Sequence, residues 1–83
     1  MDVQHEVLQI LDEVLGLRGR AQVFGASTHL LGAVPELDSM AVVSIITALE
    51  ERLGIAVSDD DIDGSTFETV GSLVAFVAAR LAD

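Results

Sequence analysis

Apolar residues recur at intervals of three and four near the start of the chain, the spacing that places side chains on one face of a helix. The members of this stripe are Val3, Val7, Ile10, Leu11, Val14 and Leu17. We therefore predict a helix from about Asp2 to Leu15. Asp2 is suited to capping its first turn, and Gly16 and Gly19 are suited to ending it.

The same periodicity returns after Asp38 as a wider apolar stripe. Its members are Met40, Val42, Val43, Ile45, Ile46, Leu49 and Leu53. Asp38 is a favourable N-cap residue, and Gly54 is favourable just beyond a helix end. The sequence therefore predicts a second long helix over Ser39–Leu53.

A third periodic stretch ends the chain, with apolar positions at Val70, Leu73, Val74, Val77 and Leu81. Thr69 can cap this stretch, so we predict the last helix over Val70–Leu81. The preceding segment Ile55–Val57 is too short and isolated to indicate a strand. The acidic segment Ser58–Glu68 has room for one short helix.

The segment from Arg18 to Asp38 shows no helical periodicity, and Gly32 and Pro35 interrupt it. Long loops in small domains are usually functional or held down by their own side chains. The residues expected to attach this loop to the core are Phe24, Leu30, Leu31, Val34 and Leu37. The pattern thus predicts one all-α domain over residues 1–83, a small bundle of three main helices plus one short helix with a long first loop.

Charge narrows the classes of partner. Four basic residues face fourteen acidic ones, which gives a formal net charge of −10. Nucleic acid is an unsuitable partner for such a chain, because phosphate binding needs clustered Lys and Arg. Basic protein surfaces are the natural complement, although acidity also serves solubility alone.

The absence of Cys removes disulfides, Cys-zinc sites and thiol nucleophiles together. No apolar run approaches the roughly 18 residues that a membrane span needs, and the start of the chain does not resemble a signal peptide. We therefore expect a cytoplasmic protein without a membrane span, and we expect it to be a monomer.

Asp38 and Ser39 stand where chemistry is most plausible. A serine at the first position of a helix lies beside free backbone N–H groups and the positive end of the helix dipole, which favour a phosphate. Asp38 can cap the helix and offer a carboxylate to a divalent ion held by a modifying enzyme. Taken alone, however, Asp-Ser at a helix start is also what capping preferences produce without any chemistry.

The segment from Leu30 to Leu53 resembles the acyl carrier protein family. That family is marked by Asp-Ser-Leu or Asp-Ser-Met at the start of its second helix, followed by an aliphatic stripe and acidic residues. Here the motif reads Leu37-Asp38-Ser39-Met40. The later segment Thr66–Leu73 resembles the start of the family's last helix, whereas the N-terminal helix agrees in pattern only.

The resemblance assigns roles to three positions. Ser39 matches the serine that receives 4′-phosphopantetheine from coenzyme A, and Asp38 matches the acid that assists the phosphopantetheinyl transferase and its metal. Met40 matches the apolar residue at which partner enzymes dock. The prosthetic thiol would hold acyl groups as thioesters and present them to acyl-loading and acyl-transferring enzymes with basic docking surfaces, as in lipid or polyketide biosynthesis.

The aliphatic core offers an environment for an acyl chain, since each buried methylene is worth about 0.8 kcal/mol. The residues at which we expect such an acyl cavity are Val43, Ile46, Ile62, Phe67 and Leu73. For any one of these five residues taken alone, plain core packing is the favoured interpretation.

Two subgroups of carrier show the same motif. The motif Asp-Ser-Met resembles the D-alanine carriers, which gives a D-alanyl or peptidyl-type carrier as an alternative. The segment Leu31–Met40 together with Ala48–Arg52 resembles carriers associated with bacterial exosortase and exopolysaccharide systems. Fatty-acid-synthesis carriers usually bear acidic residues early on the second helix, but here the first acidic residues of that helix are Glu50 and Glu51. This difference from the fatty-acid-synthesis carriers favours partner enzymes that are dedicated to this carrier.

The segment Asp59–Gly64 matches the opening of an EF-hand calcium loop. The twelfth position of that loop needs a bidentate Glu, but Val70 stands there, and Thr66 occupies the usually hydrophobic eighth position. We therefore assign no metal site. A loosely bound cation or a solvated acidic turn remain the alternatives.

No catalytic residue is assigned. Ser39 lacks a Gly-x-Ser-x-Gly elbow, and neither His5 nor His29 has a motif around it. The remaining alternative to a carrier is an acidic helical protein-interaction module without a prosthetic group. Such a module would need nothing at Ser39, so covalent modification of Ser39 separates the two.

Overall fold

Three α-helices make up the body of the protein, seen in a computed structural model that describes residues 2–58, 62 and 64–82. The helices are α1 (Val3–Leu15), α2 (Ser39–Leu53) and α3 (Val70–Ala82). A 3-10 turn, η1 (Arg20–Val23), lies in the long connection between α1 and α2. No strand occurs among the described residues, and the all-α bundle expected from the sequence is confirmed.

Local capping sets the helix ends. The Asp2 side chain accepts a hydrogen bond from the backbone N–H of His5, and Gly16 ends α1 in the left-handed region at φ 64°. Thr69 and Ser72 cap α3 reciprocally: Ser72 N donates to Thr69 Oγ1 at 3.1 Å, and Thr69 N donates to Ser72 Oγ at 3.0 Å. These exchanges satisfy amides that have no partner within the helix.

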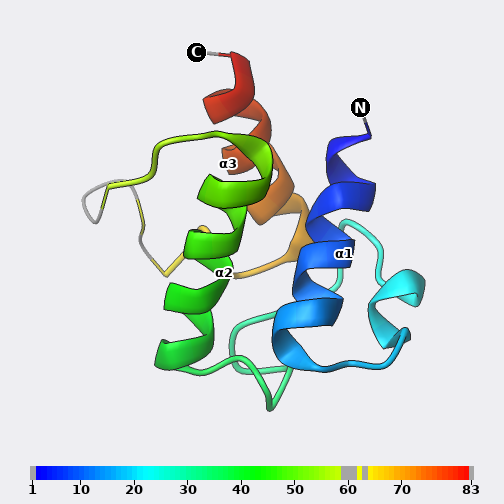
Figure 1. Ribbon diagram of the computed structural model, residues 1–83. Helices are drawn as coiled ribbons and strands as arrows, with labels where there is room; N and C mark the ends of the chain where they lie inside the picture. Colours follow the sequence, from blue (N-terminus) through cyan, green and yellow to red (C-terminus); the bar gives the residue numbers. More distant parts are fainter. Residues whose placement is uncertain (1, 59–61, 63, 83) are drawn as a thin grey trace.

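The core lies where the helices meet, and α1 packs against both α2 and α3. The largest fully buried side chains are Val7, Ile10, Leu11, Leu17, Leu30, Ile45, Leu49, Phe67, Val70, Leu73 and Val77. Figure 1 shows α1 and α2 side by side, with the end of α1 and the start of α2 at the same end of the molecule. The first connection therefore covers that end.

The connection between α1 and α2 is held by backbone hydrogen bonds to the segment that precedes α3. Leu30 N donates to Glu68 O at 2.9 Å, and Leu31 N donates to Phe67 O at 3.0 Å. Leu30 and Leu37 are buried as expected, and Phe24 and Val34 are half-buried against the core. The expectation for Leu31 was wrong: it is 48% exposed, at the start of the turn that the amides of Ala33 and Val34 close onto Leu30 O.

The short helix expected within Ser58–Glu68 falls partly outside the described residues. The described part from 64 to 67 is a turn. The short helical element that the structure does describe is η1, in a segment for which we expected only loop.

Candidate functional site

Ser39 is the first residue of α2, and Asp38 is its N-cap. The Asp38 backbone is extended, and Asp38 Oδ1 accepts a hydrogen bond of 2.8 Å from Ala41 N. Ser39 is exposed, and its hydroxyl makes no hydrogen bond within the described part of the chain. Capping thus fixes the backbone around the exposed Ser39 side chain.

The start of α2 also offers unpaired donors. Val42 N makes the first bond of the helix, to Asp38 O at 3.0 Å, and Ala41 N is taken by the Asp38 side chain. The amides of Ser39 and Met40 have no acceptor among the residues described. Together with the positive helix end, these two amides suit a phosphate group joined to Ser39 Oγ.

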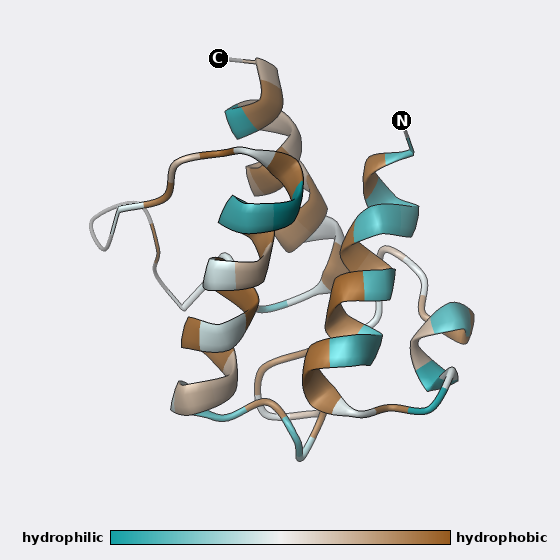
Figure 2. Cartoon of the chain, in the orientation of Figure 1, coloured by the Kyte–Doolittle hydropathy of each residue, from teal (hydrophilic) through white to brown (hydrophobic). Residues whose placement is uncertain are grey.

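Apolar side chains surround this position on the exposed side of α2. Met40 is 77% exposed and Val43 is 60% exposed. No acid stands in the first turn of the helix, and Glu50 and Glu51 lie near its end. Figure 2 shows this division, with apolar and neutral turns at the start of α2 and hydrophilic residues toward its end.

The five residues predicted to line an acyl cavity occupy different depths. Val43 points to solvent, whereas Phe67 and Leu73 are buried in the core. Ile46 and Ile62 are partly buried against that core. The acyl cavity within the bundle therefore stays a prediction. To form such a cavity, α2 and the segment before α3 would have to move apart.

Asp12, Arg20 and Glu36 organise the first loop, and the sequence reading missed all three. Asp12 accepts hydrogen bonds from Gly19 N at 3.1 Å and from Ala21 N at 3.2 Å. Arg20 donates from Nε to Leu17 O at 3.1 Å and forms an ion pair with Glu36. The hydrogen bond from Arg20 lowers the pKa of Glu36 below its ordinary value.

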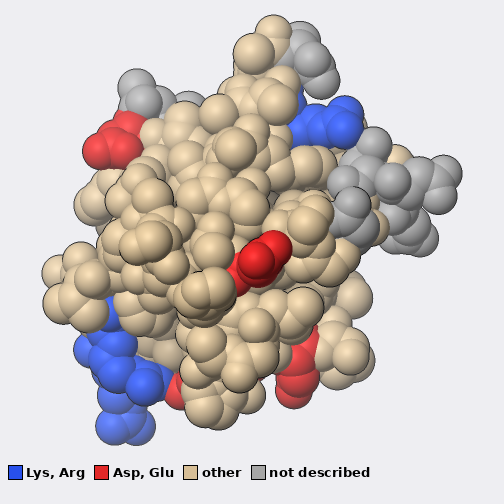
Figure 3. All heavy atoms as spheres, turned by 180° about the vertical axis from the view of Figure 1, so that it is seen from behind, with Lys and Arg blue, Asp and Glu red and all other residues tan. Residues whose placement is uncertain are grey.

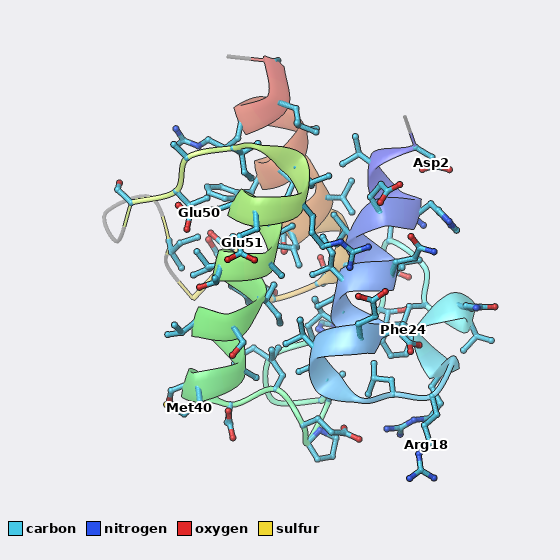
Figure 4. All side chains as sticks on the ribbon, viewed as in Figure 1. Asp2, Arg18, Phe24, Met40, Glu50 and Glu51 are labelled. Carbon is cyan, nitrogen blue, oxygen red and sulfur yellow. The ribbon has the colours of Figure 1, made fainter. Side chains whose placement is uncertain are left out.

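A pocket of about 470 Å³ opens between η1 and the segment that leads to α2. Its lining is mainly apolar, with Arg20 and Glu36 among its polar members. Figure 4 shows Phe24 beside η1 and Arg18 at the end of the molecule where α1 stops. One part of the sequence pattern indicates this pocket: apolar residues cluster in a segment that lacks helical periodicity.

The remaining sequence candidates add no chemistry to this site. His5 and His29 are exposed, and the backbone of His29 forms an isolated bridge with Thr69. Among the residues described, no group of three or more His, Cys, Asp or Glu side chains is placed to hold a metal ion. Most of the EF-hand-like segment, Asp59–Asp61 and Asp63, lies outside the described residues, so the choice between a loosely bound cation and a solvated acidic turn there stays untested. Within the described chain, no helix has both the length and the apolar character that a membrane crossing requires.

Comparison with known proteins gives concordant results. Residues 5–77 match the protein family described as "Phosphopantetheine attachment site". Acyl carrier protein MbtL of Mycobacterium bovis and of Mycobacterium tuberculosis is 45% identical over 47 residues, 57% of this chain and 54% of the relative. The chain thus spans about half the length of the curated relatives it matches.

The fold is similar to a solution NMR structure of a holo acyl carrier protein from Nitrosomonas europaea. The two superpose with a TM-score of 0.92 and share 51% sequence identity, and the match covers 100% of each chain. At this identity the likeness extends beyond the arrangement of helices to half of the individual residues.

Proposed function

The chain belongs to the phosphopantetheine attachment family, and we propose that it is an acyl carrier protein whose 4′-phosphopantetheine arm is joined to Ser39. The observation that carries this assignment is the exposed, unbonded hydroxyl of Ser39 at the capped start of α2. Ser39 lies within the residues that match the family. The amides of Ser39 and Met40 would then stabilise the charge of the attached phosphate.

In the attachment reaction, Ser39 Oγ is the nucleophile. It attacks the phosphate group that is bonded to the pantetheine part of coenzyme A. The new bond is a phosphodiester, the pyrophosphate bond of coenzyme A breaks, and the nucleotide bisphosphate leaves. The hydroxyl proton passes to a base supplied by the transferase. Among the described residues near Ser39 no side chain is bonded to the hydroxyl, which fits activation by the modifying enzyme.

Asp38 has two roles in this proposal. Its Oδ1 is engaged in the cap, and its carboxylate remains at the surface beside Ser39. A divalent ion in the transferase would be attracted to that charge, since carboxylate oxygens are preferred ligands of Mg²⁺. Once bound, the arm supplies a thiol that holds acyl groups as thioesters, and the chain itself performs no catalytic step.

Partner enzymes would meet two kinds of surface along α2. Residues 40, 43, 47 and 51 follow one side of the helix at helical spacing, and all four are exposed. Met40 and Val43 offer apolar contact beside Ser39, whereas Glu51 offers charge farther along. We therefore expect acyl-loading and acyl-transferring enzymes to bury Met40 and to place basic groups toward Glu51, in the cytoplasm where coenzyme A is available.

The test is intact mass after incubation with coenzyme A, magnesium and a broad-specificity phosphopantetheinyl transferase. Ser39→Ala is the control, and Ser44→Ala is a matched serine variant on the same helix. We expect one phosphopantetheine on the wild type and on Ser44→Ala, and none on Ser39→Ala. A folded wild type that gains no mass with several transferases would instead support a non-catalytic interaction module.

A further inference from the structure

The turn that follows α1 holds an arginine in a strained backbone conformation. Arg18 has a φ of 55° and is, among the described residues, the only one other than glycine in the left-handed region. That conformation costs free energy for any residue with a Cβ atom, and glycine or asparagine is favoured there. The neighbours hold Arg18 in place, because Leu17 is buried and Gly19 N donates to Asp12 Oδ1 at 3.1 Å. A strained residue of this kind points to a use for its side chain.

The guanidinium group of Arg18 is exposed and has no partner within the described chain. It makes no hydrogen bond or ion pair with any residue that the structure describes. The other three arginines each have a partner among the described side chains: Arg20 with Glu36, Arg52 with Glu13, and Arg80 with the ring of Phe76. In a chain with fourteen acidic residues, Arg18 thus keeps its charge available to a group from outside the molecule.

Two contacts of Arg20 join this turn to the segment that leads to Ser39. Arg20 Nε donates to Leu17 O at 3.1 Å, and the Arg20 guanidinium pairs with Glu36, three residues before Ser39. Figure 4 shows Arg18 and Met40 at the same end of the molecule. Seen from behind, a group of basic side chains gathers at the lower edge of a largely uncharged surface (Figure 3).

The size of an ordinary interface brings this turn and the start of α2 together. Such an interface covers about 800 Å² of each partner, whereas the whole protein exposes only 4771 Å². A partner enzyme seated over Ser39 therefore has room to contact Arg18 as well.

We propose that Arg18 is a second contact point for the phosphopantetheinyl transferase, which places a carboxylate against the Arg18 guanidinium while it acts on Ser39. The proposal rests on the proposed function, because the transferase is a partner only if Ser39 is modified. Guanidinium and carboxylate groups pair through two parallel hydrogen bonds. This contact is opposite in sign to the one expected at Glu51, where the partner offers a basic group. Two contacts of opposite sign fix the orientation of the carrier, since a reversed carrier would set like charges together.

A direct contact at Arg18 and the net charge of the chain predict effects of opposite sign. Because the chain has a net charge of −10, loss of a positive charge anywhere strengthens its long-range attraction to a basic partner and raises the rate. The proposed contact predicts instead that Arg18→Gln lowers kcat/KM for the carrier by about two- to fivefold, the range that one exposed ion pair provides. Arg80→Gln, in the last turn of α3, changes the net charge equally. We expect that control to react at the wild-type rate or faster.

The measurement is the initial rate of phosphopantetheine attachment by intact mass, with the carrier and coenzyme A varied separately. Attachment to the wild type is established first, and failure at that stage counts against the proposed function. We expect Arg18→Gln to raise KM for the carrier and to leave KM for coenzyme A unchanged, with a difference from the wild type that shrinks as salt is added. A change confined to KM for coenzyme A would place a coenzyme A phosphate against Arg18 and overturn the proposal. Arg18→Gln that behaves like Arg80→Gln would overturn it as well.

Arg18→Asn separates the charge of Arg18 from its backbone conformation. Asparagine adopts the left-handed conformation more readily than most residues, so this variant keeps the turn. We expect its midpoint of urea unfolding to equal or exceed that of the wild type, and its kcat/KM to fall as in Arg18→Gln. Wild-type kinetics in Arg18→Asn would assign the loss in Arg18→Gln to a disturbed turn and refute the contact with a carboxylate.

Discussion

The backbone of Gly71, at the start of α3, approaches the backbone of Ala26 in the first loop. Gly71 N donates a hydrogen bond of 2.8 Å to Ala26 O. A Cβ atom built on Gly71 would lie 2.9 Å from that oxygen, closer than Cβ atoms approach a backbone oxygen in real structures. The missing side chain of Gly71 therefore lets the first loop dock on α3, and the loop carries both the pocket and the approach to Ser39.

Gly71→Ala should accordingly destabilise the fold. Alanine favours a helix over glycine by about 1 kcal/mol, but at this site its methyl group meets backbone that must move. Overpacking of this kind costs about 1–3 kcal/mol, so we expect a net loss in the free energy of unfolding, measured by urea titration with circular dichroism. Gly25→Ala is the control, because a Cβ there meets nothing within 4 Å. A Gly71→Ala protein as stable as the control would show that the loop yields freely.

The helices could be predicted from the sequence because their signals are local. The span of α2 agrees with the expected Ser39–Leu53, since Asp38 and Gly54 mark its ends and the apolar stripe fills the space between. The role of Ser39 was predicted from that cap together with the resemblance of the surrounding segment to a known family, and it stays a prediction. Neither conclusion needed information from a distant part of the chain.

The first loop could not be predicted in the same way. Asp12 reads as a polar residue on a helix surface, yet it binds the amides of Gly19 and Ala21 beyond the helix end. Glu36 and Arg20 stand 16 residues apart, and nothing in the sequence pattern indicates their pairing. Such contacts depend on the path of the loop, which side-chain periodicity does not determine.

Substitution of Asp38 should separate its structural role from its charge. Asp38→Ala removes the cap, which costs about 1 kcal/mol of stability, whereas asparagine caps helices about as well as aspartate. We therefore expect Asp38→Asn to keep the stability of the wild type but to accept phosphopantetheine more slowly. The measurements are urea unfolding and the initial rate of modification by intact mass. Modification of Asp38→Asn at the wild-type rate would remove the proposed role of the carboxylate.

The ion pair of Arg20 and Glu36 should make a small, pH-dependent contribution to stability. The hydrogen bond from Arg20 lowers the folded-state pKa of Glu36 below its ordinary value of 4.5. A lowered pKa stabilises the fold at pH above the unfolded-state value, and this stabilisation is lost as the pH falls through the folded-state value.

The pH dependence is isolated by comparing the wild type with Arg20→Ala. We expect the wild type to be the more stable at pH 7, with the difference shrinking as the pH falls below 4.5. A part of the difference will persist, because Arg20 also donates to Leu17 O. A difference that stays constant from pH 7 to acid conditions would contradict a contribution from Glu36.

Docking on α2 should depend on two residues in physically different ways. Met40 is exposed beside Ser39 and carries no charge, so Met40→Ala should reduce the rate of modification by a similar factor at low and high salt. Glu51→Gln removes a charge that attracts a basic partner over some distance, and such attraction is screened within about 10 Å at 0.1 M salt. The effect of Glu51→Gln on the rate should therefore be largest at low salt and shrink as salt is added.

Initial rates of modification across a salt series distinguish apolar docking at Met40 from charge attraction at Glu51. Thr47→Ala is an uncharged control between the two positions. If Glu51→Gln lowers the rate equally at all salt concentrations, the partner does not use charge at this end of α2, and docking rests on the apolar start of the helix alone.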